Sequence, residues 1–142
     1  MNFISGQLRT VGSGVAIEID TGLAKSLLKL PFGLTQMQAY IGTNVVLGLR
    51  PQRITADRAI HSSSRFPAQT VEVRVDVVEP TGPDTLITTH LNGKRVVSRI
   101  HPGTRPDDAS RLSLLFDLSK AVLFDPDKAT RIDAVSAIHQ AA

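Results

Sequence analysis

The sequence predicts an all-β domain, and three observations lead to that prediction. Residues 71–79, VEVRVDVVE, alternate apolar and charged side chains, which is the period of a strand with one buried face. The dipeptide Asn92-Gly93 separates two strand-like runs, and both of its residues tolerate the positive φ of a type I′ hairpin turn. Glycines and prolines punctuate the other apolar runs at intervals typical of a small barrel or sandwich.

In chain order, the expected strands are short and separated by turn residues. They lie at residues 3–8, 14–19, 45–49, 71–79, 85–91, 94–100 and 111–116, with a hairpin turn at Gly12-Ser13-Gly14. The three runs within residues 71–100 are expected to form a meander. Residues 23–30, LAKSLLKL, fit either one helical turn or a bent strand. Phe124, followed by Asp125-Pro126, is interpreted as an apolar plug and turn that close the barrel.

The chain of 142 residues is long enough for one domain with its own core. We expect this domain at residues 1–132, with two strand clusters joined near residues 55–70 and a frayed tail at 133–142. The chain has no cysteine, so disulfides and thiolate chemistry are excluded. No apolar run is long enough to span a membrane, and the N-terminus lacks a signal-peptide pattern, so a cytoplasmic location is expected.

The net charge of +3 and the calculated pI of 9.7 raise the question of nucleic-acid binding. The 16 basic residues are, however, dispersed among 13 acidic ones, and no aromatic residue is interleaved with a basic cluster. Binding along a phosphate backbone needs a stripe of positive charge, and single-strand binding adds stacking aromatic rings. The pattern therefore favours a solvated surface of mixed charge and argues against a nucleic-acid partner.

Motifs for catalysis are missing from the sequence. It contains no G-x-x-x-x-G-K-[ST] loop for nucleotide phosphates and no recognisable Ser-His-acid set. The histidines fall singly, at positions 61, 90, 101 and 139; His90 and His101 could meet across the meander, but isolated surface histidines are far commoner than metal sites. The acidic pairs Asp107-Asp108 and Asp125/Asp127 stand beside prolines, where turn chemistry explains them. The sequence therefore predicts no enzyme in this chain and no metal site.

Three segments, in order, resemble one known domain. VLGLRP at residues 46–51 is similar to the "LGIRPE" stretch, VVEPTGPDTL at 77–86 to "VVEPLGSETL", and LFDPDKATRI at 123–132 to "LFDPxTGxRI". These stretches belong to the C-terminal regulatory domain of the ATP-binding subunits of maltose/glycerol-phosphate-type sugar-import ABC transporters. The opening Met1-Asn2-Phe3 resembles the junction between their nucleotide-binding and regulatory domains.

The resemblance implies an oligonucleotide-binding-like (TOBE) small β-barrel with a second strand cluster and little helix. It implies a non-catalytic regulatory and dimerisation domain of an importer for a sugar, a polyol or glycerol phosphate. ATP and Mg²⁺ would bind the parent's nucleotide-binding domain, so no cofactor is expected in this chain. The implied partners are a second copy, the nucleotide-binding domain, the membrane subunits indirectly and a regulatory protein. The implied location is cytoplasmic, peripheral to the inner membrane through the transporter complex.

Two strand ends supply the candidate interface. Pro51 has no N–H and pushes the preceding Arg50 into an extended conformation, so the pair ends strand pairing at a defined point. The Arg50 guanidinium can then bind a carboxylate, either within the domain or across a dimer, and Glu79 faces the same two alternatives. The family Glu and His after Arg-Pro are Gln52 and Arg53 here. The candidate dimer or regulatory interface comprises Arg50, Pro51, Gln52, Glu79, Pro80 and Gly82.

The sequence is also compatible with two other functions. An oligonucleotide-binding-type barrel could bind nucleic acid or a small oxyanion directly, which would require a basic groove on one face. A stand-alone enzyme would require a pocket with convergent titratable groups. The sequence shows no pattern that indicates either the basic groove or the pocket.

Overall fold

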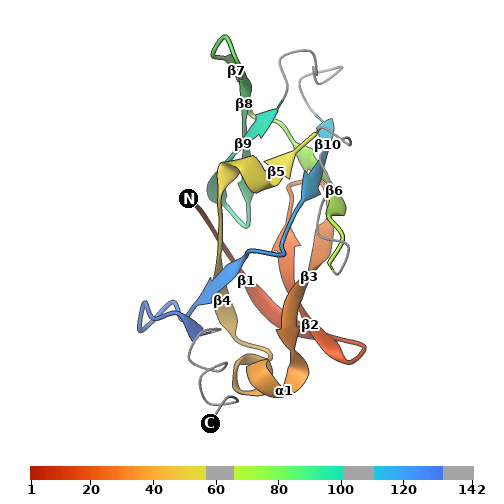
Figure 1. Cartoon of the computed structure of the whole chain (residues 1–142), viewed down its shortest axis with the longest axis vertical. Coiled ribbons are helices and arrows are strands. Elements are labelled where there is room, and N and C mark those ends of the chain that lie inside the picture. The colour runs from red at the N-terminus through yellow and green to blue at the C-terminus, as the bar shows by residue number, and fades with distance from the viewer. Residues whose placement is uncertain (57–65, 101–110, 133–142) are drawn as a thin grey trace.

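The computed structural model describes residues 1–56, 66–100 and 111–132, and it shows a chain built almost entirely of antiparallel strands (Figure 1). In these described ranges no helix is long and apolar enough to cross a bilayer. The elements in the described residues are β1 (Asn2–Val11), β2 (Gly14–Asp20), β3 (Lys25–Gly33), α1 (Leu34–Met37), the 3₁₀ turn η1 (Gln38–Tyr40), β4 (Asn44–Leu49), the 3₁₀ turn η2 (Pro51–Arg53), β5 (Ile54–Thr55), β6 (Gln69–Arg74), β7 (Val77–Pro80), β8 (Thr85–Leu91), β9 (Lys94–Ile100), β10 (Arg111–Phe116) and β11 (Val122–Phe124).

The strands form three sheets around one hydrophobic core. A five-stranded sheet has the order β11-β4-β1-β2-β3, and two three-stranded sheets have the orders β5-β10-β6 and β7-β8-β9. Leu47, Phe116 and Ile87, one from each sheet, are fully buried in the same cluster. The prediction of an all-β, oligonucleotide-binding-like fold is confirmed. The division into residues 1–132 and a tail stays a prediction, and residues 133–142 lie outside the described residues, as does most of the 55–70 connection.

Both predicted hairpin turns are present. Asn92 and Gly93 have φ values of 52° and 76°, and β8 and β9 pair on either side of them from Leu91↔Lys94 onward. Gly12, with φ 58°, turns the chain between β1 and β2. These two turns agree with the sequence because their geometry depends on adjacent residues alone.

The prediction of one continuous strand at residues 71–79 is wrong. β6 pairs with β10, whereas β7 pairs with β8 in another sheet, so the meander consists of β7, β8 and β9 only. The chain leaves one sheet for the other at Val75-Asp76, where the Asp76 N–H donates to the Thr88 carbonyl at 2.9 Å. Val73 and Val75 are buried, but Val77 is 50 % exposed, so the alternation continues past the break without a buried face.

Residues 23–30, which fitted either a helical turn or a strand, belong mostly to strand β3. Leu28 and Leu30 face the core, and Leu28 pairs opposite Ile17 of β2. The single-turn helix α1 that follows was not predicted. Four residues are too few for a helical hydrophobic period to be visible in the sequence.

Three amide side chains connect sheets whose strands do not pair with each other. Asn2, which is buried, donates through Nδ2 to the Val97 carbonyl at 2.7 Å and accepts the Val97 N–H at 3.0 Å, so it links β1 to β9. Gln69 makes the same two-way contact with the backbone of Lys29, at 2.9 and 2.7 Å, and links β6 to β3. Each side chain thus makes the same two hydrogen bonds, one donated and one accepted, that a paired residue makes in an antiparallel sheet.

The third amide belongs to Asn92, at the tip of the β8-β9 hairpin. Its Oδ1 accepts the Asp20 N–H at 2.7 Å, and its Nδ2 donates to the carbonyls of Ser5 and Glu18. Its own backbone N–H donates to the Asp20 carbonyl at 2.9 Å. Asn92 therefore has two functions: it adopts the positive φ of the turn and it fixes the hairpin to β1 and β2.

We predict that Asn92→Gly lowers the free energy of unfolding by about 1–3 kcal/mol, because glycine keeps the turn and removes only the side-chain hydrogen bonds. Urea unfolding followed by circular dichroism measures the difference. Gln7→Ala is the control, because it removes a single exposed hydrogen bond, from Nε2 to the Gly42 carbonyl. Equal losses in the two variants would contradict a special role for Asn92.

Candidate functional site

The six residues of the predicted interface lie in two places rather than one. Arg50, Pro51 and Gln52 occupy the end of β4 and the turn η2, which packs against β9. Glu79 and Pro80 lie on β7, at the opposite edge of the β7-β8-β9 sheet, and Gly82 lies in the turn that follows. Strands β8 and β9 therefore separate the two groups, and the two must be considered as distinct surfaces.

The backbone at Arg50 agrees with the prediction. Arg50 is extended, with φ −71° and ψ 146°, and Pro51 opens η2, whose Arg53 N–H donates to the Arg50 carbonyl at 2.9 Å. The Arg50 side chain is exposed and makes no ion pair with another described residue. Among the described residues, then, the guanidinium does not hold its own domain together.

Arg53, rather than Arg50, forms an ion pair within the domain. Its Nη1 donates to Asp117 Oδ2 at 2.9 Å, and its carbonyl accepts the Asp117 N–H at the same distance. Asp117 Oδ1 also accepts the hydroxyl of Ser119 at 2.7 Å and its N–H at 3.1 Å. The sequence did not indicate this pair, because 64 positions separate the two residues.

These contacts set the protonation of Asp117. Partial burial raises the pKa of its carboxyl group, but the hydrogen bonds from Ser119 and Arg53, with the charge of Arg53, together outweigh burial and leave the pKa below its ordinary value. A carboxylate with a lowered pKa stabilises the fold above the pKa of the unfolded chain. That contribution disappears as the pH falls through the folded-state value.

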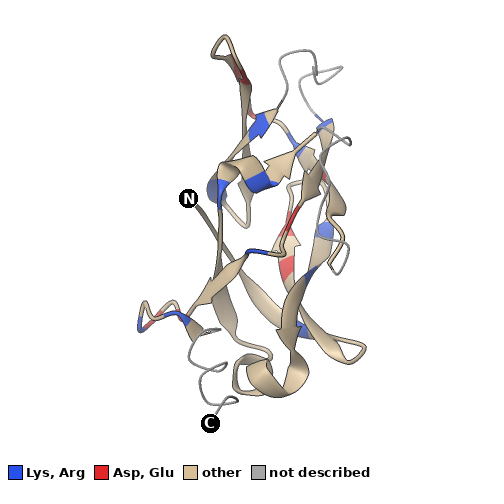
Figure 2. Ribbon diagram, in the orientation of Figure 1, with Lys and Arg blue, Asp and Glu red and all other residues tan. Residues whose placement is uncertain are grey.

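A pocket of about 590 Å³ opens beside this ion pair, and we call it the η2 pocket. Its charged and amide lining residues are Arg50, Gln52, Arg53, Asp117, Lys120 and Arg131. Figure 2 shows basic positions both on η2 and on the segment that joins β10 to β11. The sequence analysis missed this pocket, because its basic residues come from three separate segments of the chain.

Strand β7 forms the second surface. All four of its residues are exposed, and Val77 and Val78 are 50 % and 38 % exposed although they are β-branched and apolar. Glu79 has no ion pair with another described residue. The turn after β7 contains Gly82 at φ +97°, a conformation in which a side chain would be strained. Among the described strands β7 lies at the edge of its sheet, and none of them pairs with its outer side.

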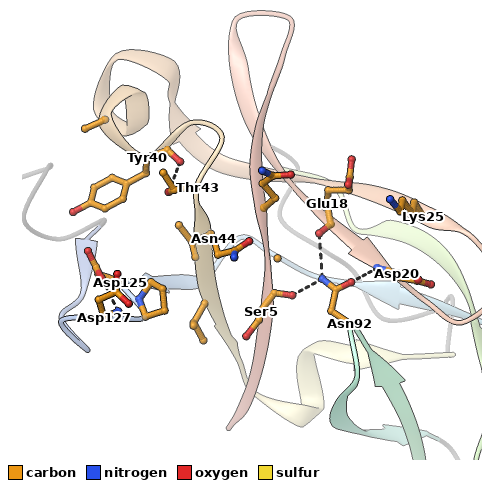
Figure 3. Close-up of a pocket in the computed structure, with 16 residues that line it drawn as sticks. Ser5, Glu18, Asp20, Lys25, Tyr40, Thr43, Asn44, Asn92, Asp125 and Asp127 are labelled. Carbon is orange, nitrogen blue, oxygen red and sulfur yellow. Dashed lines mark hydrogen bonds between the residues drawn. The ribbon is translucent and has the colours of Figure 1, made fainter.

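A second pocket, of about 810 Å³, lies over β1, β2 and β4 (Figure 3). Glu18, Asp20, Asp125 and Asp127 line it together with Lys25. Figure 3 shows Asn92 at its edge, bonded to Ser5, Glu18 and Asp20, so part of this lining holds the fold together. Within the described part of the chain, no three His, Asp or Glu side chains are grouped as metal ligands.

The remaining candidates have structural explanations. Asp125 Oδ1 accepts the N–H groups of Asp127 and Lys128 at 2.8 and 3.1 Å, so turn chemistry is confirmed there. His90 binds the carboxylate of Asp76 at 2.6 Å through Nδ1. The other three histidines and the Asp107-Asp108 pair lie outside the described residues.

The prediction that Phe124 plugs the barrel is wrong. Its neighbour Leu123 points into the core with no exposed surface, and strand alternation places Phe124 on the opposite side. There it packs edge to face against Phe3, with ring centroids 6.0 Å apart, and Phe3 is itself 52 % exposed. A Cβ at Gly48 would lie 3.0 Å from the Phe124 ring and 2.9 Å from Val122, so this packing requires glycine in the VLGLRP motif.

A family model described as the TOBE domain matches residues 47–124, from β4 to the end of β11. The chain belongs to the TOBE domain family. The match covers more than half of the chain and includes all of η2 and β7. The resemblance drawn from the three sequence motifs is therefore confirmed.

Several curated relatives of this TOBE domain are import ATP-binding proteins. The oligosaccharides import ATP-binding protein MsmX of Bacillus subtilis is 25 % identical over 136 residues, which are 93 % of this chain and 34 % of the relative. The sn-glycerol-3-phosphate import ATP-binding protein UgpC of Ralstonia nicotianae is 32 % identical over 135 residues, 90 % of this chain and 33 % of the relative. The chain thus spans about a third of the length of these relatives.

Solved structures with a similar fold include the cytoplasmic molybdate-binding protein ModG with molybdate bound. It superposes with a TM-score of 0.52 at 16 % identity, and the match covers 88 % of this chain and 96 % of ModG. At that identity the likeness concerns the fold alone. It shows that these strands form a known domain architecture.

We predict that Asp117→Asn lowers the free energy of unfolding at pH 7 by about 1–2 kcal/mol, because the charge-assisted hydrogen bond to Arg53 is lost. The difference from the wild type should shrink as the pH falls below about 4, the ordinary pKa of an aspartate in an unfolded chain, and then through the lower folded-state pKa of Asp117. Urea unfolding at several pH values measures both effects.

Asp84→Asn is the matched control for that variant. Asp84 pairs with Arg99 at 3.5 Å in a more exposed setting, so its loss should cost less, at most about 1 kcal/mol. A difference at Asp117 that stays constant down to pH 2 would show that its charge is not responsible.

Proposed function

We propose that this TOBE domain is the non-catalytic C-terminal regulatory and dimerisation domain of the ATP-binding subunit of an ABC importer for a sugar, a polyol or glycerol phosphate. The observation that carries the proposal is the family match, together with relatives that are import ATP-binding proteins three times as long. ATP and Mg²⁺ would bind the other part of such a subunit, since this sequence contains no phosphate-binding G-x-x-x-x-G-K-[ST] loop. The parent would lie on the cytoplasmic side of the inner membrane, held there by the membrane subunits.

Strand β7 supports the dimerisation part of the proposal. Its outer edge has no neighbouring strand among the described residues, and Val77 and Val78 expose apolar surface beside it. Two copies related by a two-fold axis could pair β7 with β7 antiparallel, which gives a self-complementary contact. Glu79 and Pro80 would then lie in or beside this contact.

The size of β7 limits the strength of such a dimer. Four residues give only about 13 Å of strand, and a stable interface buries about 1,600 Å² in total. The isolated domain should therefore dimerise weakly, while the nucleotide-binding domains of the parent would add contact area. A contact on the two-fold axis could persist while those domains open and close.

We predict that light scattering across a concentration series shows the mass of this chain rising from monomer toward dimer. Val77→Lys should raise the dimer dissociation constant about tenfold or more, because a charge replaces apolar surface on the pairing edge. Leu27→Lys is the matched control: Leu27 is also 50 % exposed and also lies on an edge strand, β3.

The outcomes separate the alternatives. A larger effect from Leu27→Lys would assign the contact to β3 instead of β7. A strict monomer at the highest concentration would overturn dimerisation through this domain.

A further inference from the structure

We propose that the η2 pocket binds a small phosphorylated molecule, with Arg50, Arg53 and Lys120 holding the phosphate group. The binding itself does not depend on the dimerisation proposed above. If that role is correct, however, the pocket supplies the regulatory domain with a site for an anionic effector.

The first argument is the concentration of charge. Four of the residues that line the pocket are cationic, namely Arg50, Arg53, Lys120 and Arg131, and Asp117 is its single carboxylate. Arg131 has a further interaction within the chain, and without it the lining still carries three cations against one carboxylate. Like charges that converge in a concave, partly desolvated place repel each other, and an anion relieves that repulsion.

The second argument is that Asp117 pairs with Arg53 and, among the described contacts, does not compete for Arg50 or Lys120. Its Oδ2 accepts from Arg53 at 2.9 Å, and its Oδ1 accepts two hydrogen bonds from Ser119, so its charge is already compensated. The same pair fixes the Arg53 side chain at the pocket wall and leaves further guanidinium N–H groups for a ligand. Asp117 is thus a positioning residue for Arg53.

The third argument is that two of the cations have no ion-pair partner among the described residues. Arg50 and Lys120 are exposed, and neither forms an ion pair with another residue in the described ranges. They come from different parts of the chain, one from the end of β4 and the other from the β10-β11 connection, and both line the pocket. A guanidinium and an ammonium facing one cavity match the charge and geometry of a phosphate group.

The fourth argument concerns the class of ligand. At about 590 Å³ the pocket is within the usual range of small-molecule sites and much larger than a bare oxyanion. Ala68, Leu115 and Val122 add apolar wall, and the Gln52 amide adds a polar group. A phosphate monoester of a small polyol would use both the cations and these walls, whereas inorganic phosphate would use only the cations.

Isothermal titration calorimetry of the whole chain with glycerol 3-phosphate, inorganic phosphate and neutral glycerol tests the proposal. We expect saturable binding of glycerol 3-phosphate in the range of about 1 mM or tighter, weaker binding of inorganic phosphate and none of glycerol. The double variant Arg50→Ala/Lys120→Ala should weaken glycerol 3-phosphate binding at least tenfold. Circular dichroism confirms that this variant is folded.

The double variant Arg95→Ala/Lys94→Ala is the matched control. It removes the same two charges from exposed positions on β9 that do not line the pocket, and it should change the affinity less than twofold.

Equal weakening by the two double variants would show unspecific attraction and overturn the site. Absence of saturable binding by the wild type would also overturn it, and inorganic phosphate binding as tightly as the monoester would overturn the choice of ligand class. None of these results depends on the mass measured by light scattering, so the two proposals can fail separately.

Discussion

The structure depends on side-chain amides that form hydrogen bonds between sheets whose backbones do not pair with each other. Asn2 and Asn92 join the five-stranded sheet to the β8-β9 hairpin, and Gln69 joins it to β6. An asparagine or glutamine carries a donor and an acceptor side by side, so it can satisfy one backbone N–H and one backbone carbonyl where strands approach without pairing. With those polar groups satisfied, the three sheets can share one apolar core.

The segments that resemble the family have physical explanations in packing and turns. Gly48 in VLGLRP lets Val122 and the Phe124 ring pass directly over β4, and Pro51 ends that strand. Asp125 in LFDPDKATRI binds the backbone of its own turn. The motifs are therefore typical of the TOBE fold because their residues shape its strands and turns. They lie beside the two candidate functional surfaces, but neither surface consists of motif residues alone.

The two surfaces suit different partners because their physical characters differ. β7 offers an unpaired strand edge with apolar side chains, which suits another polypeptide. The η2 pocket offers convergent cations and a concave wall, which suits a small anion. η2 packs against β9, and β9 is joined to β7 through β8, so both surfaces adjoin the same three-stranded sheet. If both proposals hold, the β7-β8-β9 sheet adjoins a protein contact on one side and an effector site on the other.

The sequence by itself determined what depends on neighbouring residues: the alternating strands, the turn at Asn92-Gly93, the extended Arg50 before Pro51, and hence an all-β fold of the TOBE type. Only the tertiary structure decided that residues 71–79 divide between two sheets, because a strand that changes partners keeps its extended backbone and its alternation. It also decided the candidate site. Arg53 and Asp117 meet across 64 positions, and Lys120 joins Arg50 in one pocket, through strand pairing and packing that no local pattern encodes.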